Sequence, residues 1–185
     1  TINISSPNTE NLRSFHDNDR FNELLDSIEF EKNKLKSNVP IVVKISPDIL
    51  EEQIEQISSS LLNYEIKAII ISNTTASNRG ILKDVNKHQK GGLSGKPLED
   101  ISNKLISKFY KLLKNKIEII GVGGVDSGNS AYKKFLAGAS FIQLYTGMVF
   151  QGPGIVRNIK KELKELLIAD GVKSYKEIIG KKIRN

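Results

Sequence analysis

Five short apolar runs, rich in β-branched residues, alternate along the chain with amphipathic helical patterns. Such continuously apolar runs are typical of strands that are buried on both faces of a parallel sheet. The runs predict strands at 1–4, 41–45, 68–71, 117–120 and 141–144. Apolar residues at helical spacing predict helices at about 18–28, 50–61, 98–112, 129–136 and 156–166, with a short basic tail after them. Five consecutive strand–helix units therefore predict an α/β protein.

Two architectures fit this pattern, a doubly wound sheet and a (β/α)8 barrel, and both bind ligands at the carboxyl edge of the sheet. Polar residues gather at that edge, because they follow the end of every predicted strand. The polar segments are 5–8, 46, 73–74, 123–124 and 145–146. Polar turns at strand ends are common, but their occurrence after all five strands favours a functional site there.

Residues 121–128 form a glycine-rich loop between a predicted strand and the next helix. Exposed backbone N–H groups in such a loop suit a phosphate, although a tight structural turn has the same composition. Asp126 stands where a dinucleotide fingerprint needs its third glycine, so the loop is of another kind. With residues 145–147 it gives two successive loops that could share one phosphate, as after strands 7 and 8 of a barrel. The five strands would then be strands 4 to 8.

The only methionine is Met148, so the chain lacks an initiator and opens directly on a predicted strand. We therefore expect residues 1–185 to be the C-terminal portion of a single barrel domain, with three strands missing upstream. Unpaired strand edges are a liability that complete barrels remove. The isolated 185 residues are accordingly expected to be inactive and poorly soluble.

Lys44 lies inside an apolar strand, where a lysine is costly unless it meets an anion or a polar ligand. A cation there could stabilise negative charge on a reduced cofactor ring, although an ammonium group that reaches solvent at the strand end is the structural alternative. Uncharged donor–acceptor side chains follow other strands, at Asn3, Asn8, Asn73 and Thr74. Amides can read the edges of a planar heterocycle such as a pyrimidine, whereas each one alone is ordinary turn chemistry.

Ser6 lies in a loop restrained by Pro7, and spacing alone does not mark it as catalytic. A serine base needs a special environment, and no Gly-x-Ser-x-Gly motif surrounds it. His16 and His88 are expected at the surface. Two isolated histidines and scattered carboxylates do not make a metal-binding pattern, so no metal is predicted.

Composition narrows the picture further. The 185 residues contain no cysteine, which excludes a disulfide framework, a cysteine-based zinc site, an iron–sulfur cluster and a thiol nucleophile. The net charge of +7 is more typical of a solvated surface than of a nucleic-acid interface, so no nucleic-acid partner is expected. No run approaches the roughly 18 apolar residues of a membrane span.

Six motifs together resemble the dihydroorotate dehydrogenases, in an order and spacing that match along essentially the whole chain. They are NISSPNT at 3–9, VKISPD at 43–48, SNTT at 72–75, GGLSGKPL at 91–98, IGVGGV at 120–125 and QLYT at 143–146. The resemblance implies an FMN-dependent (β/α)8 TIM barrel, of which this chain is similar to the C-terminal half to two-thirds.

The resemblance also implies roles for these residues. Ser6 would be the base that removes the C5 proton of dihydroorotate, while hydride leaves C6 for N5 of FMN. The pyrimidine ring and its carboxylate would be held by Asn3, Asn8, Asn73 and Thr74. The residues around FMN would be Asn3, Lys44, Ser72, Ser94 and Gly95 along the cofactor, and Gly123, Gly124, Tyr145 and Thr146 at its phosphate.

The base separates two classes of the family. The soluble class, which uses fumarate or NAD, has cysteine where this chain has Ser6, whereas the membrane-associated class 2 enzymes reduce a quinone. The resemblance therefore implies oxidation of dihydroorotate to orotate in de novo pyrimidine (UMP) biosynthesis, with a quinone as final electron acceptor. It further implies contact with a membrane through an N-terminal segment absent here. That membrane would be the mitochondrial inner membrane in a eukaryote or the cytoplasmic membrane in a bacterium.

Two alternatives remain. Another FMN-dependent TIM-barrel oxidoreductase, such as a flavin oxidase of 2-hydroxy acids, would need a histidine base and an arginine pair, but no histidine follows a predicted strand. A non-enzymatic role, as an inactive fragment or a basic nucleic-acid binder, is the other. A nucleic-acid binder would need aromatic residues among its basic ones, whereas the five tyrosines and seven phenylalanines are spread through core patterns.

Overall fold

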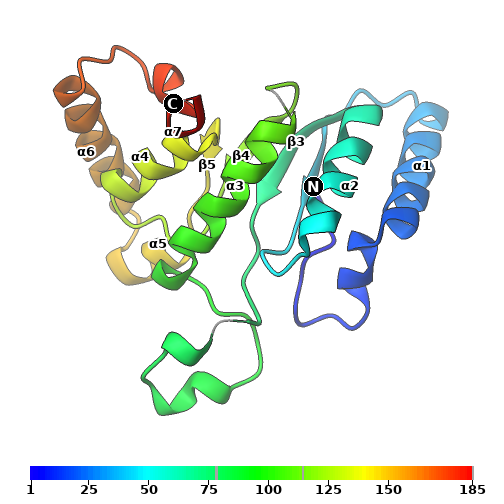
Figure 1. Cartoon of the computed structure of the whole chain (residues 1–185), viewed down its shortest axis with the longest axis horizontal. Coiled ribbons are helices and arrows are strands. Elements are labelled where there is room, and N and C mark those ends of the chain that lie inside the picture. The colour runs from blue at the N-terminus through cyan, green and yellow to red at the C-terminus, as the bar shows by residue number, and fades with distance from the viewer. Residues whose placement is uncertain (78, 114, 185) are drawn as a thin grey trace.

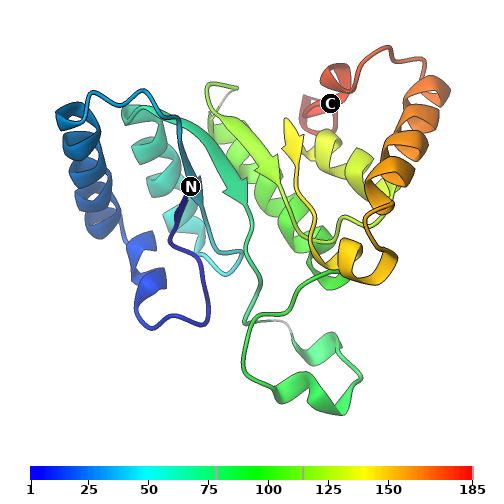
Figure 2. The same ribbon diagram turned by 180° about the vertical axis from the view of Figure 1, so that it is seen from behind.

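The computed structural model describes residues 1–77, 79–113 and 115–184. At its centre is a five-stranded parallel sheet whose strands neighbour one another in chain order (Figures 1 and 2). The strands are β1 (Ile2–Asn3), β2 (Ile41–Lys44), β3 (Ile66–Ile71), β4 (Glu118–Gly121) and β5 (Phe141–Ile142). All five predicted strands are confirmed, although β3 begins two residues earlier and β5 ends two residues earlier than the pattern predicts.

The helices follow the strands as the periodicity predicts. Within the described residues they are α1 (Asn18–Lys34), α2 (Glu51–Asn63), α3 (Glu99–Leu113), α4 (Gly128–Ala137), α5 (Thr146–Gln151), α6 (Ile155–Ala169) and α7 (Lys181–Arg184). Asp17 caps α1, where its carboxylate accepts a hydrogen bond from the Asp19 N–H at 3.2 Å. None of the helices in the described parts of the chain combines the length and the apolar character that crossing a bilayer requires.

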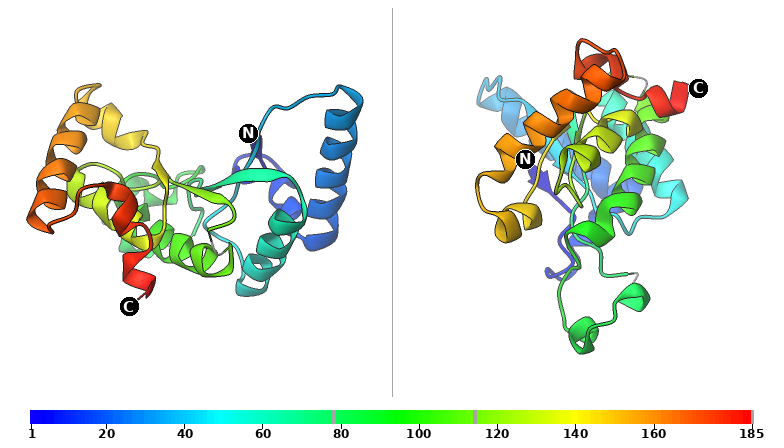
Figure 3. Two further views of the ribbon diagram at one scale, coloured as in Figure 1. Left: turned by 90° about the horizontal axis from the view of Figure 1, so that it is seen from above. Right: turned by 90° about the vertical axis from the view of Figure 1, so that its left-hand side faces the viewer.

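Alternate residues of each strand face opposite sides of the sheet. Val43, Ile69 and Ile71 are fully buried and pack in one cluster with side chains of the helices. Lys44 and Ile70 face the other side and stand in register across β2 and β3. Figure 3 shows the helices in an arc along one side of the curved sheet. A doubly wound sheet would reverse its strand order and carry helices on both faces, so the fold is of the TIM-barrel type.

The short basic tail after the last long helix is folded. Beyond α6 the chain forms a 3₁₀ helix at Tyr175–Ile178 and then α7, and both contact α4 (Figure 1). Ile178 is fully buried, and the N–H of Gly180 donates to the carbonyl of Phe135 at 2.9 Å. Ile179 and Ile183 also pack against the core, so apolar residues among the lysines hold this segment against the helical layer.

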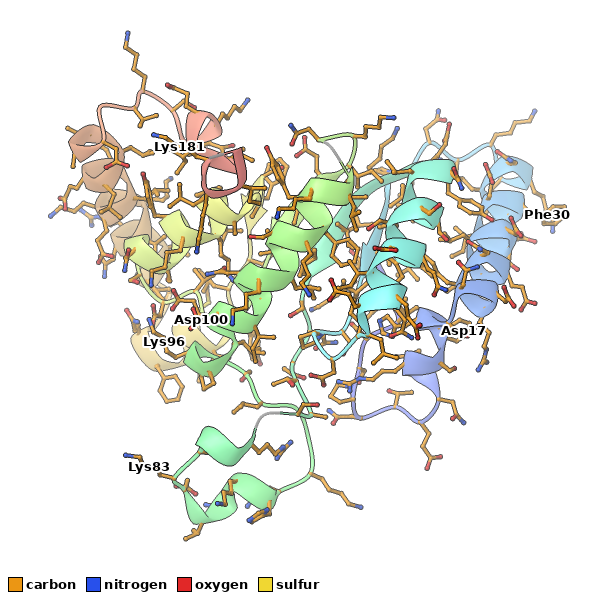
Figure 4. All side chains as sticks on the ribbon, viewed as in Figure 1. Asp17, Phe30, Lys83, Lys96, Asp100 and Lys181 are labelled. Atoms are coloured by element: carbon orange, nitrogen blue, oxygen red, sulfur yellow. The ribbon has the colours of Figure 1, made fainter. Side chains whose placement is uncertain are left out.

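The long polar segment after β3 leaves the sheet as a projecting loop, which carries Lys83 on its outer side (Figures 2 and 4). An antiparallel bridge between Thr75 and Leu93 closes the base of the loop. The Arg79 guanidinium donates to the carbonyls of residues 87, 89 and 91 on the returning limb. The segment from Leu93 onward therefore returns to the carboxyl edge of the sheet.

Candidate functional site

A cavity of about 460 Å³ opens beyond the carboxyl ends of β2 to β5. Its volume lies within the range of roughly 300–1,000 Å³ that is usual for small-molecule sites. Ten of the thirteen predicted site residues line it: Lys44, Ser72, Asn73, Thr74, Ser94, Gly95, Gly123, Gly124, Tyr145 and Thr146. Asn3, Ser6 and Asn8 do not line it. Lys96, which also lines the cavity, lies near α5 and the start of α3 (Figure 4).

The glycine-rich loop after β4 has a backbone that only glycine adopts easily. Gly123 and Gly124 have φ angles of 106° and 74°, in the left-handed region. A Cβ on Gly124 would lie 2.7 Å from the Cα of Glu99, at the start of α3. Among the described residues, the N–H groups of the two glycines have no hydrogen-bond acceptor. A loop of this kind can bind an anionic oxygen through its backbone.

Glu99 holds the beginning of α3 under this loop. Its side chain is buried, and its carboxylate pairs with Lys96 and Lys133, each at 3.1 Å. Burial acts to raise the pKa of Glu99, but the hydrogen bonds from the two lysines outweigh it and hold the pKa below its ordinary value. The carboxylate is therefore ionised and fixed, which leaves little room for the loop above it to move.

Lys44 ends β2 and faces the cavity. Its strand partners in register are Asn3 on one side and Ile70 on the other. Burial lowers the pKa of Lys44 below its ordinary value. The alternation along the strand thus places the Lys44 cation on the face of the sheet opposite the helices.

The amides that follow β1 and β3 form one hydrogen-bonded cluster with Ser5. The Ser5 hydroxyl donates to Asn3 Oδ1 at 2.5 Å, and Asn73 Nδ2 donates to Ser5 Oγ at 2.9 Å. The Asn73 Oδ1 in turn accepts from the Thr74 N–H at 2.8 Å. Ser5 is fully buried, so it fixes the orientation of both amides. Sequence reasoning missed Ser5, because nothing in its local pattern distinguishes it from a turn serine.

Ser6 and Asn8 lie in the same loop, after β1. The Ser6 Oγ accepts a hydrogen bond from the Asn8 N–H at 3.2 Å. The returning segment lies over them, since a Cβ on Gly91 would lie 4.0 Å from Asn8 Oδ1 and one on Gly92 would collide with Thr74. The two glycines therefore allow this segment to approach the loop closely.

The same returning segment continues to the opposite side of the cavity. Gly95 has a φ of 78°, and a Cβ there would lie 3.0 Å from Thr146. Thr146 Oγ1 donates to Ser94 Oγ at 3.0 Å. Residues 91–95 thus connect the amide cluster with the start of α5, and they enclose the cavity from one side.

The expected surface position of His16 is wrong, since the side chain is 2% exposed. Its Nε2 accepts from the Ser46 N–H at 3.2 Å, and its Nδ1 lies 2.8 Å from the carbonyl of Arg13. Burial lowers the pKa of His16, and the charge of Arg13 adds to this effect. The ring is therefore a neutral connector between backbone groups. His88 lies on a 3₁₀ helix of the projecting loop and is not buried.

Lys134 is another buried lysine, and sequence reasoning missed it. It is fully buried on α4, where Nζ donates to Ser102 Oγ at 3.1 Å and to Asn103 Oδ1 at 3.0 Å. The Ser102 hydroxyl donates to the carbonyl of Val122 at 2.6 Å, just before the glycine pair. Burial lowers the pKa of Lys134 to about 8. The pattern of α4 gave no sign that this lysine faces inward.

Comparisons with known proteins agree with this geometry. Residues 1–167 match the family model described as "Dihydroorotate dehydrogenase". A protein of Wigglesworthia glossinidia brevipalpis named "Dihydroorotate dehydrogenase (quinone)" is 48% identical over 165 residues, which are 87% of this chain and 49% of that protein. One of the same name from Psychrobacter sp. (strain PRwf-1) is 44% identical over 161 residues, 85% of this chain and 47% of that protein.

Solved structures extend the match to three dimensions. The crystal structure of ligand-free DHODH from Eimeria tenella is 33% identical with a TM-score of 0.94, and the match covers all of this chain and 56% of that one. The chain spans about half the length of the curated relatives it matches. By sequence over most of its length and by fold over all of it, the chain belongs to the dihydroorotate dehydrogenase family.

Proposed function

We propose that this chain is the C-terminal portion of a quinone-reducing dihydroorotate dehydrogenase, whose single FMN-binding (β/α)8 domain uses β1 to β5 as barrel strands 4 to 8. The observation that carries the proposal is one cavity that joins a glycine-rich loop, a half-buried cation and an ordered amide cluster. Its relatives are about twice as long. Within the described residues β1 and β5 each pair with one strand only, and closing a barrel requires a partner on both sides.

The cavity fits FMN. Gly123 and Gly124 offer unpaired N–H groups to the phosphate in a backbone shape that excludes a Cβ, and Tyr145 and Thr146 flank the same end. Lys44, which lines the cavity, would lie beside the flavin ring and stabilise negative charge on it. The remaining cofactor contacts would come from Asn3, Ser72, Ser94 and Gly95. When bound, FMN supplies the hydride acceptor for the oxidation and passes the electrons to the quinone.

The chain's own residues bind dihydroorotate and remove its proton. The amide of Asn73 is held at both ends, by Ser5 and by the Thr74 N–H, so its orientation toward a pyrimidine ring is set before binding. Asn3, Asn8 and Thr74 would complete the contacts to the ring and its carboxylate.

Ser6 Oγ takes the proton from C5 and passes its own hydroxyl proton to water, while hydride leaves C6 for the flavin. The electron pair of the C5–H bond becomes the C5=C6 double bond of orotate. The N–H of Asn8, which donates to Ser6 Oγ, stabilises negative charge on that oxygen. The N–H therefore helps the Ser6 hydroxyl to give up its own proton as the proton of C5 arrives.

The same proposal implies the electron acceptor and the cellular location of the enzyme. Curated relatives bear the name "Dihydroorotate dehydrogenase (quinone)", and Ser6 occupies the base position of that class. The enzyme would contact a membrane through a segment N-terminal to Thr1, in the mitochondrial inner membrane or the bacterial cytoplasmic membrane. Residues 1–185 alone would be inactive, because the exposed edges of β1 and β5 remain without partners.

The test uses the full-length protein that contains this chain, purified with its flavin and mixed anaerobically with substrates. Dihydroorotate should bleach the flavin absorbance, and decylubiquinone should restore it, whereas fumarate and NAD should not. A 2-hydroxy acid such as lactate should leave the flavin oxidised. Bleaching by lactate but not by dihydroorotate would contradict the proposed substrate. Reoxidation by fumarate or NAD alone would contradict the proposal that a quinone is the electron acceptor.

A further inference from the structure

Arg13 lies outside the cavity and connects three loops at the carboxyl edge of the sheet, of which the loop after β3 lines the cavity. Its Nη1 pairs with Asp48 Oδ2 at 3.1 Å, in the loop after β2. Its Nε reaches the carbonyl of Ser5 at 3.5 Å, and its Nη2 reaches the carbonyl of Thr74 at 3.4 Å. One guanidinium thus touches the loops after β1, β2 and β3.

Asp48 completes this connection from the middle loop. Besides Arg13, its carboxylate accepts hydrogen bonds from the hydroxyl of Thr75 and from the N–H of Ala76 at 2.7 Å. The side chains of Asp48 and Arg13 are 13% and 28% exposed, so the pair is screened less than a surface ion pair. Charge-assisted hydrogen bonds of this kind are stronger than hydrogen bonds between neutral groups.

His16 fixes the base of the same assembly. Its Nε2 accepts from the Ser46 N–H, two residues before Asp48, while its Nδ1 meets the carbonyl of Arg13. The 3₁₀ helix Leu12–His16 is therefore attached to the loop after β2 twice, through Arg13 and through His16. This arrangement leaves Arg13 and Asp48 little freedom relative to each other.

Two carbonyl groups that Arg13 binds lie next to residues on which the proposed chemistry depends. The Ser5 carbonyl directly precedes Ser6, and the Thr74 carbonyl directly follows Asn73. Arg13 and Asp48 are absent from the cavity lining, so they act on the site through these two loops. We propose that Arg13 and Asp48 are positioning residues that set the Ser6 loop against the loop of Asn73 and Thr74, so that base and substrate meet at the reacting carbon.

This inference rests on the proposed function, and its test separates the two. In the full-length flavoprotein, Arg13→Lys and Asp48→Asn are compared with wild type and with Arg20→Ala. Arg20 is the control, because it lies on the adjacent α1 and, among the described residues, contacts Ser14 and the Phe15 ring rather than the loops after β2 and β3. Failure of wild type to be reduced by dihydroorotate contradicts the proposed function, whereas unchanged variants contradict the positioning role.

The rate constant of flavin reduction at saturating dihydroorotate is expected to fall about 100-fold in both variants, the scale of a misplacement near 1 Å. Orotate affinity and flavin content should remain within about threefold of wild type. With dihydroorotate deuterated at C5, the isotope effect should rise, because a displaced base makes proton transfer the slower event. Arg20→Ala should match wild type in each measurement.

Two results would overturn the proposal. One is a wild-type reduction rate in both Arg13→Lys and Asp48→Asn. The other is a loss of rate that parallels the loss of flavin and of thermal stability, with the C5 isotope effect unchanged, since that pattern marks a purely structural role. Asp48→Asn can place its one oxygen where Asp48 Oδ2 accepts from the Ala76 N–H, so it is the variant expected to fold best.

Discussion

Replacing Gly124 with alanine tests whether the glycine-rich loop has the shape that phosphate binding requires. The added Cβ would lie 2.6 Å from the Cβ of Glu99, 2.7 Å from its Cα and 2.8 Å from its N. Ordinary contacts of a Cβ are 3.4–4 Å. Because two of these atoms belong to the backbone of α3, the loop itself must move.

The cost has two parts. Holding an alanine at a φ of 74° costs about 1–2 kcal/mol, and relieving the overlap costs about 1–3 kcal/mol. We expect the free energy of unfolding to fall by about 2–5 kcal/mol. Each 1.4 kcal/mol that appears as lost flavin binding raises the dissociation constant tenfold, so the FMN dissociation constant should rise at least tenfold.

The assay is urea unfolding of the full-length protein together with FMN titration followed by flavin fluorescence. Gly154→Ala is the matched control, because Gly154 has a φ of −64° and a Cβ there would meet nothing within 4 Å. That control should change stability by less than about 0.5 kcal/mol. A Gly124→Ala protein with the stability and flavin affinity of Gly154→Ala would refute the reasoning.

Two further predictions concern the lysines. Burial lowers the pKa of Lys134 to about 8 in the folded protein from an ordinary 10.5, so the unfolded chain binds more protons between these values and stability rises with pH there. In urea unfolding, wild type should therefore gain stability relative to Lys134→Met from pH 8 to 10, and equal slopes would contradict this. Lys44→Met should slow flavin reduction by dihydroorotate about 100-fold, the scale for loss of one charge-stabilising donor. Lys67→Met, at an exposed position of β3, should not, and equal stopped-flow rates in the two variants would exclude a role for the Lys44 charge.

The sequence pattern predicts the sheet well, because strand alternation and helical spacing are local. The same alternation correctly places Lys44 on the inner face, across from the helices. Strand ends are less well predicted, since the short β5 is bounded by its pairing with β4 rather than by its own composition. Ile178, Ile179 and Ile183 show that a segment with several lysines can still pack through its few apolar side chains.

Contacts between loops are what the sequence could not predict. Arg13 and Asp48 are 35 positions apart, and Arg13 and Thr74 are 61 apart, so no local spacing relates them. His16 was expected at the surface because its neighbours are polar, yet two backbone hydrogen bonds satisfy both ring nitrogens in the interior. The site's residue types were predictable from the strand ends, whereas the residues that hold the loops together required the structure.

The most direct test of the account is a single-turnover comparison of full-length wild type, Ser6→Ala and Ser27→Ala under anaerobic conditions. Ser27 is an exposed serine of α1 that bonds to its own helix, so it controls for the substitution. The account predicts that all three bind FMN and orotate, that dihydroorotate bleaches the flavin in wild type and Ser27→Ala, and that Ser6→Ala is bleached at least about 100-fold more slowly. Bleaching of Ser6→Ala at the wild-type rate would contradict the assignment of Ser6 as the base, and no bleaching in wild type would contradict the proposed reaction.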